Sequence, residues 1–476
     1  MKANEIVATP LSPRRGGGDE ASQYIDLYAS QRELICSGSA PVMNAVRDAA
    51  MQQFAAQGFP TLKEERYRYT DVAAAFAPDY GLNLNRVRIP VNPREVFRCD
   101  VPNLSTDLVY LVNDQPLLEK PIPYVSSLRQ ACIDHPDLVE KYYNQCAAFS
   151  PSLSERGPGG EALLNTAFAQ DGLFVHVPRG ERMNHPLQVI NILRSPVDMM
   201  VNRRVLIVLE EGAEATILLC DHAMDTVSFL TTQVIEVFCA DRSRLDLYEL
   251  EETHTSCRRF SNLQMTVGSD CVVSHNSITL YNGLTRNTAD VALTGERSEI
   301  TMNGCVVADK NQHVDNNTLI DHIAPSCTSR ELYKCVADDE AVSAFAGRIL
   351  VRKDAQKTSS KETNNNLCAT DTARIYTQPM LEIYADDVQC SHGSTVGVLD
   401  QQALFYMQQR GIAEAEARLL LKNAFVGQVI EQVRLQPLRD RLHHLIDKRF
   451  RGELNKCTGC ALCEPHPQPL SEGRGA

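Results

Sequence analysis

The sequence predicts a mainly β fold that lies between two helical regions. From about residue 170 to residue 398, short segments rich in Val, Ile, Leu, Thr and Tyr follow one another with few helix signals. A turn of small residues recurs before a strand at spacings of 28, 28 and 27 residues. On both sides of this region, apolar residues recur with the period of a helix.

The repeated turn favours a β-solenoid. The turns begin at Gly212, Ala240, Gly268 and Gly295. A period near 28 residues suits a solenoid, in which each coil stacks on its neighbours around a shared apolar interior. The next similar turn, at Ala337, comes 42 residues later, so a segment around residues 313–330 is expected to interrupt the repeat. On spacing alone, a β-sandwich with evenly spaced turns stays open.

The strands are assigned from short runs of β-branched and aliphatic residues between turn signals. The predicted strands are residues 172–177, 187–193, 204–209, 215–219, 232–238, 245–250, 263–267, 277–281 and 298–302.

Helices are predicted at both ends of the chain. Residues 22–78 contain an apolar stripe at every fourth position (Val42, Val46, Ala50, Phe54), which ends at Gly58 and Pro60. After the β region, Asp400 is a suitable N-cap for a helix over 401–410, and Gly411 is a suitable stop. Further helices are predicted over 414–432 and 438–450.

These patterns divide the chain into five regions. Residues 1–24 form a disordered N-terminal tail, residues 25–165 a helical and mixed domain, and residues 166–398 the β core. Residues 399–452 form a C-terminal helical domain, and residues 453–476 a flexible tail that contains cysteines. Both tails are rich in Pro, Gly and charge, which cannot bury enough apolar surface to offset the entropy of ordering.

Composition excludes several classes of function. The chain of 476 residues is 43% hydrophobic and carries a net charge of −13. A negative surface repels phosphate backbones, so nucleic-acid binding is not expected. No apolar run approaches the roughly 18 residues that a membrane helix needs. No apolar segment follows the N-terminal Met-Lys-Ala-Asn-Glu, so we expect a cytoplasmic protein without a membrane partner.

The unusual number is 16 cysteines in a chain without tryptophan. In the cytoplasm thiols stay reduced, so most cysteines inside apolar strands, such as Cys220, Cys239 and Cys271, are expected to be small buried hydrophobes. The segment Cys390-Ser391-His392 differs. On a strand, Cys390 and His392 point to one face roughly 7 Å apart and could share a metal or a sulfur species. Two ligands are too few for a closed metal site. Two interpretations therefore remain open: an ordinary structural role, and a site that a partner chain completes.

At this point the sequence resembles a known family. Residues 379–412 contain Leu-Glu-Ile-Tyr-Ala-Asp-Asp-Val, then Cys-Ser-His-Gly-Ser-Thr-Val-Gly, then Leu-Asp-Gln-Gln-Ala-Leu-Phe-Tyr-Met-Gln-Gln-Arg-Gly-Ile. This stretch, together with residues 58–70, 313–322 and 345–351, resembles the SufB/SufD family of the SUF iron–sulfur cluster assembly machinery. The resemblance covers residues 25–450, and Gly393, where SufB usually has Glu, favours the SufD branch.

The resemblance implies a fold and a function. It implies a right-handed parallel β-helix between helical regions, in a non-catalytic scaffold subunit of a SufBCD complex. A SufB-like paralogue would pair with the end of the β-helix, and a SufC-like ABC ATPase would bind the C-terminal helices. His392, with Cys390 as the weaker candidate, would lie at the SufB interface, where a transient iron–sulfur cluster forms; no cofactor is expected to bind stably. The chain alone could form a homodimer.

The C-terminal helices supply a candidate docking surface. The segment with Lys422, Phe425 and Val426 is our candidate for SufC binding, and packing within the chain is the alternative reading. A polar cluster of His313, Asp315, Asp321 and His322 could bind metal, but a surface loop with structural hydrogen bonds is the preferred reading, and no site is assigned there.

The C-terminal tail adds a possible metal site. Cys457, Cys460, Cys463 and His466 are spaced three residues apart, and C-x₂-C-x₂-C also opens the ferredoxin ligand run. Three readings remain open: a zinc or iron site, a flexible iron or thiol carrier, and a solvated tail without a role.

Two other classes of function are alternatives to a scaffold. A β-helix enzyme of the lyase or acyltransferase type would show a basic groove or hexapeptide repeats, and neither is evident. An independent metal-binding redox protein would depend on the incomplete cysteine motif of the tail. The sequence has no Walker A motif and no dinucleotide fingerprint after a predicted strand, so ATPase activity would come from the SufC-like partner.

Overall fold

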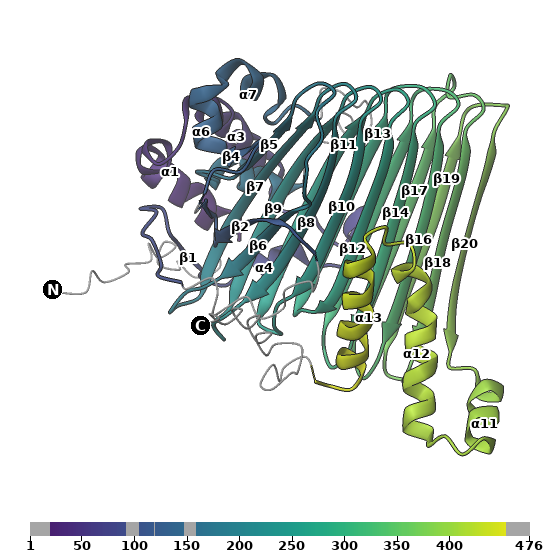
Figure 1. The fold of residues 1–476 in the computed structure, drawn as a ribbon. Coiled ribbons are helices and arrows are strands. Elements are labelled where there is room, and N and C mark those ends of the chain that lie inside the picture. Colours follow the sequence, from purple (N-terminus) through teal and green to yellow (C-terminus); the bar gives the residue numbers. More distant parts are fainter. Residues whose placement is uncertain (1–19, 92–103, 119, 147–158, 454–476) are drawn as a thin grey trace, which may run out of the picture. The chain divides into compact units, whose positions relative to one another are not determined.

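The computed structural model describes residues 20–91, 104–118, 120–146 and 159–453 (Figure 1). It is mainly β, with a parallel β-helix of about eight turns and helices before and after it. This confirms the predicted fold class. The chain forms two compact units. One comprises Met1–Ile89 and Ser105–Leu399, and the other comprises Pro90–Leu104 and Asp400–Ala476.

Successive strands alternate between two sheets, so each strand pairs in parallel with the strand two further along the chain. The odd sheet contains β5 (Leu173–Val177), β7 (Met199–Leu209), β9 (Phe229–Cys239), β11 (Cys257–Val267), β13 (Leu284–Leu293), β15 (His313–His322), β17 (Val342–Val351) and β19 (Arg374–Ile383). The even sheet contains β6 (Leu187–Leu193), β8 (Glu214–Ala223), β10 (Arg244–Glu252), β12 (Val272–Tyr281), β14 (Glu299–Ala308), β16 (Thr328–Ala337), β18 (Ser359–Cys368) and β20 (Gln389–Val398).

Short strands extend both sheets at their N-terminal ends. They are β1 (Gly81–Leu82), β2 (Asp107–Val112), β3 (Gln115–Leu117) and β4 (Val125–Ser127). Parallel pairing from β5 to β20 rules out the β-sandwich, because the hairpins of a sandwich pair antiparallel strands.

Successive turns that lead from a strand of the odd sheet to a strand of the even sheet each contain a residue in the left-handed backbone conformation. Positive φ angles occur there at Gly212, Arg242, Asp270, Arg297, Ser326 and Lys357, at intervals of 27 to 31 residues. The repeat therefore continues to the end of the β-helix. The expected interruption around residues 313–330 is wrong, because this segment is β15 and the start of β16, and Ala337 belongs to the other type of turn.

The strands are longer than the sequence indicated. Strands β7 and β9 each begin several residues before the predicted segments at 204–209 and 232–238. Their first halves carry inward-facing polar side chains such as Arg203, which break the apolar pattern used for prediction.

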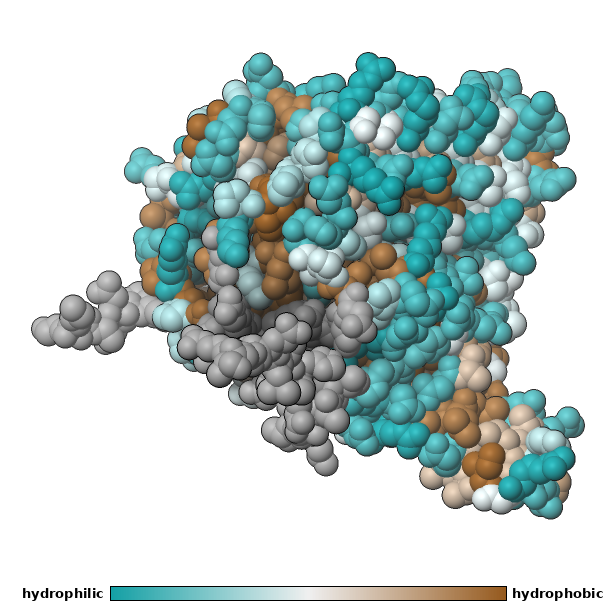
Figure 2. All heavy atoms as spheres, viewed as in Figure 1, coloured by the Kyte–Doolittle hydropathy of each residue, from teal (hydrophilic) through white to brown (hydrophobic). Residues whose placement is uncertain are grey.

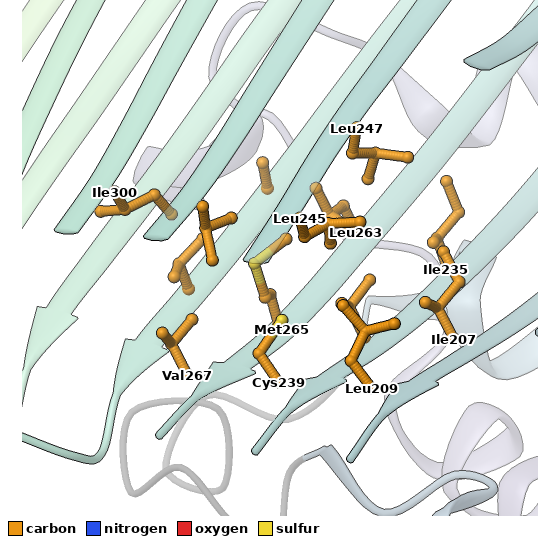
Figure 3. Close-up of a cluster of buried hydrophobic side chains, with 14 of the residues drawn as sticks. Ile207, Leu209, Ile235, Cys239, Leu245, Leu247, Leu263, Met265, Val267 and Ile300 are labelled. Carbon is orange, nitrogen blue, oxygen red and sulfur yellow. The ribbon is translucent and has the colours of Figure 1, made fainter. Parts of the chain in front are cut away.

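The main apolar core fills one side of the β-helix interior. Because alternate residues of a strand face the same way, Ile207, Leu209, Ile235, Leu263 and Met265 point inward from neighbouring coils and stack on one another (Figure 3). This continuous stack holds each coil on the next.

The N-terminal helices pack on the outer face of the odd sheet. Phe54 and Phe76 join a cluster with Phe260 of β11, and Tyr143 joins a second cluster with Leu206 of β7. The elements are α1 (Ser22–Ser37), α2 (Pro41–Ala45), α3 (Arg47–Gln57), η1 (Glu65–Tyr67), α4 (Val72–Phe76), α6 (Leu128–Asp134), α7 (Pro136–Tyr142) and α10 (Gly160–Phe168).

The second unit contains α11 (Gln401–Gln409), α12 (Glu414–Ile430) and α13 (Gln436–Phe450). Asp400 caps α11 as predicted, since its side chain accepts hydrogen bonds from the amides of Gln402 (2.8 Å) and Ala403 (3.1 Å). Gly411 follows α11 with a φ of +83°. Among the described residues, none of the helices has the length and apolar character to cross a bilayer.

Candidate functional site

In the part of the chain that the structure describes, the β-helix ends in two strand edges that no further strand covers. Among the described residues, β19 pairs only with β17, and β20 pairs only with β18. Both edge strands are ten residues long, so they leave a row of backbone N–H and C=O groups without ladder partners. Such an edge is a ready surface for another chain.

Cys390 and His392 lie on this last strand, as predicted. Alternation along β20 directs both side chains to the same face. Cys390 packs against the end of the main core, and burial raises the pKa of its thiol. His392 is exposed, because among the described residues no further coil covers it.

A hydrogen-bonded chain leads through the interior towards Cys390. His322 Nε2 lies 3.0 Å from Ser329 Oγ, which lies 2.7 Å from Ser360 Oγ. Ser360 stands opposite Cys390 in the β18–β20 register. Burial lowers the pKa of His322 to about 4, so this imidazole is neutral at pH 7. These hydrogen bonds therefore hold β18, the strand beside Cys390, without adding a charge.

Two glutamates lie below His392 in the same interior row. Glu331 of β16 is opposite Glu362 of β18, and Glu362 is opposite His392. Glu331 is 2% exposed and Glu362 is 1% exposed. None of their four carboxyl oxygens has a hydrogen-bond partner among the described residues. Burial raises the pKa of both carboxyl groups, and their mutual repulsion raises that of Glu362 further. The sequence alone does not reveal this pair, because isolated glutamates in a polar strand form no motif.

Large apolar side chains surround the open end. They are Tyr376, Ile383, Tyr384, Val396 and Val398, with exposures between 38% and 66%. Apolar groups on a long strand edge are typical of a surface that another protein covers.

The three candidate docking residues on α12 differ in accessibility. Val426 is fully buried, Phe425 is half-buried, and Lys422 places its Nζ 5.7 Å from the ring centre of Phe450. Phe405 and Tyr406 of α11 are 62% and 59% exposed, and apolar side chains gather over this part of the molecule in Figure 2. The sequence predicts α11 only as a helix and does not mark either residue as a docking residue.

The described cysteines confirm the expectation that most of them are small buried hydrophobes. Nine of the twelve are buried, and Cys36, Cys368 and Cys390 are partly buried. Burial raises the pKa of buried thiols such as Cys146, Cys239 and Cys305, which keeps them protonated. Cys457, Cys460, Cys463 and His466 lie outside the described residues.

The polar cluster on residues 313–322 lies on a strand, not on a surface loop. The Thr70 hydroxyl donates to Asp315 (2.6 Å) and lies 3.1 Å from His313 Nε2. Asp321 pairs with Arg352. In the part of the chain that the structure describes, no three His, Cys, Asp or Glu side chains are arranged to hold a metal ion.

A cavity of about 450 Å³ lies elsewhere, between residues 57–67 and the outer face of β15, β17 and β19. Its arginines are already paired, Arg66 with Asp290 and Arg348 with Glu382. Cys390 and His392 do not line it.

Comparison with known proteins identifies the family of this chain. The family model "SUF system FeS cluster assembly, SufBD core domain" matches residues 192–425, and the "SufBD protein N-terminal region" matches residues 19–189. The chain is 31% identical to the iron–sulfur cluster assembly protein SufD of Escherichia coli, over 84% of this chain and 92% of that protein.

Two more distant relatives carry related names. An iron–sulfur cluster assembly SufBD family protein of Synechocystis is 24% identical over 89% of this chain and 95% of its own length. The SufD of Bacillus subtilis is 24% identical over 72% of this chain and 77% of its own length. With two family models spanning both its N-terminal region and its β-helix, this chain belongs to the SufBD family of SUF-system iron–sulfur cluster assembly proteins, as a homologue of SufD.

Proposed function

We propose that this protein is a scaffold subunit that pairs with a SufB-like paralogue through the edges of β19 and β20. The observation that carries this proposal is the unpaired end of the β-helix, where two ten-residue edges and exposed apolar side chains lie together with His392. A paralogue with its own open β-helix end could extend both sheets and cover these groups.

His392 then supplies an imidazole to a site shared by the two subunits, and nascent iron–sulfur clusters are its product. A neutral imidazole is a suitable ligand for iron, and a site split between two chains can open to release a cluster. Cys390 is the weaker candidate, because its raised pKa leaves little thiolate at pH 7. In this proposal the chain itself performs no catalysis and works in the cytoplasm.

The C-terminal unit binds a SufC-like ABC ATPase in this proposal. Phe405 and Tyr406 of α11 are the exposed apolar groups that favour it, with Lys422 and Phe425 of α12 as further contacts. Val426 contributes to the fold of the unit, because its side chain is fully buried.

Reconstitution with SufB-like and SufC-like partners tests the proposal. His392→Ala should leave the complex assembled but lower the yield of clusters about tenfold, the scale on which lost metal-site groups act. Ser391→Ala is the matched control, because Ser391 is exposed on the same strand and faces the other way. A wild-type cluster yield with His392→Ala would refute the assigned role.

A further inference from the structure

Glu331 and Glu362 form a buried acidic pair, and no basic side chain of the described residues forms an ion pair with either of them. Their strand neighbours Arg330 and Lys361 face the outside of the coil, because side chains alternate along a strand. Burial of a charged carboxyl group without a partner is strongly unfavourable. Among the described residues, no donor makes a hydrogen bond of ordinary geometry with any of the four carboxylate oxygens.

The opposite wall of the coil leaves room for the Glu362 carboxyl group. Glu362 reaches the backbone of Gly347 on β17, where any Cβ atom would collide with its carboxyl group. The strand neighbour of Gly347 in the odd sheet is Thr318 of β15. Thr318 is 3% exposed, and its hydroxyl lies beside Glu331, where hydrogen bonding to the carboxylate lowers the pKa of that group against the larger effect of burial. No hydrogen bond of ordinary geometry satisfies this hydroxyl among the described residues, so a third oxygen faces the same space.

The row continues to the open end of the β-helix. Glu331, Glu362 and His392 occupy the same register position in three successive even strands. Parallel strands lie about 4.8 Å apart, so neighbouring carboxyl groups in this row can chelate one ion. His392 is exposed at the end of the row.

We propose that Glu331 and Glu362 bind one divalent cation inside the last coils of the β-helix, with the Thr318 hydroxyl as a neutral ligand. Two carboxylates neutralise a doubly charged ion and satisfy the oxygens that otherwise lack partners. Water would complete the coordination, which suits an ion that is exchanged rather than stored. The identification of the ion as ferrous iron rests on the proposed function, whereas the binding of a cation does not.

Binding of Mn²⁺ to the isolated full-length protein tests this site. Mn²⁺ is a suitable probe because it prefers oxygen ligands to the thiolates of the C-terminal tail, and the same ligands bind Fe²⁺ more tightly. Loss of the free Mn²⁺ signal in electron paramagnetic resonance measures binding. We expect one ion per chain, and about tenfold or weaker affinity in Glu331→Gln and Glu362→Gln.

Glu340→Gln is the control, because Glu340 is exposed in the turn after β16. It should bind Mn²⁺ like the wild type. Thermal melts should show that Mn²⁺ stabilises the wild type and Glu340→Gln but neither of the other two variants, provided that all melt cooperatively. Equal Mn²⁺ affinity in all four proteins, or no binding to the wild type at millimolar Mn²⁺, would overturn the proposal. A wild-type cluster yield with His392→Ala would refute the proposed function and leave the Mn²⁺ result standing.

Discussion

His392 stands opposite Glu362 across the β18–β20 ladder, so the exposed imidazole of the last strand continues a row that starts in the buried interior. The two residues are 30 positions apart in the chain, one coil of the β-helix. Their relationship links the candidate inter-subunit site to the interior of the protein.

The edge of β20 should control pairing with the paralogue. Val396→Lys places a charge on an exposed edge position, where lysine discourages strand pairing, and should weaken association about tenfold or more. Co-elution with the SufB-like partner in size-exclusion chromatography measures this. Val197→Lys, at a site 43% exposed in the loop before β7, should associate normally. Undiminished pairing of the Val396→Lys protein would argue against an edge-to-edge interface.

Phe405 should contribute to ATPase binding. Phe405→Asp replaces an exposed aromatic side chain by a charge and should abolish pull-down of the SufC-like partner without affecting the melt. Leu62→Asp, at a site 50% exposed in the N-terminal region, is the control. If both variants retain the ATPase equally, the docking surface lies elsewhere.

Val426 should affect stability and not recognition. Its side chain is fully buried in the helical unit, so Val426→Ala should destabilise that unit by about 2 kcal/mol. Urea unfolding measures the change. A lost interaction with the ATPase at unchanged stability would instead restore Val426 to the docking surface.

His322 should make the β-helix sensitive to acid. Its pKa is lowered to about 4 in the folded protein, whereas an unfolded histidine titrates near 6.5. The unfolded chain therefore takes up the proton first as the pH falls. The stability contribution is complete above about pH 6.5 and is lost between pH 6.5 and 4, by up to about 3 kcal/mol.

The groups around His322 are neutral on its own side of the strand. They are the hydroxyls of Ser329 and Ser360, while Asp321 pairs with Arg352 on the other side. Denaturant unfolding of wild type and His322→Gln between pH 7 and 4 should therefore converge as the pH falls. The exposed His185→Gln variant should follow the wild type. Parallel curves for the wild type and His322→Gln would contradict the assigned pKa.

Glu236 should hold the N-terminal region on the odd sheet. It forms a fully buried ion pair with Arg204 and accepts hydrogen bonds from the amides of Asn144 (2.8 Å) and Cys146 (3.3 Å). Glu236→Gln leaves Arg204 without its counter-ion and should cost about 3–5 kcal/mol in urea unfolding. Glu211→Gln, which weakens partly exposed pairs with Arg179 and Arg242, should cost at most about 1 kcal/mol. Similar losses in both variants would contradict this account.

Much of the fold could be predicted from local patterns. The turns around Gly212 and Gly268, the N-cap Asp400 and the stop at Gly411 all depend on neighbouring residues, so the sequence reveals them. The first halves of β7 and β9 could not be found in this way, because a buried polar side chain such as Arg203 depends on partners from other coils.

The sequence by itself determined the family, the mainly β class, the flanking helices and the presence of Cys390 and His392 on one strand. Only the tertiary structure decided that β20 is an edge, that Val426 is buried, and that Glu331 and Glu362 lie in one row below His392. The physical reason is that spacing within one strand fixes which side chains share a face. Stacking between coils instead depends on the register of strands about thirty residues apart, which no local pattern encodes.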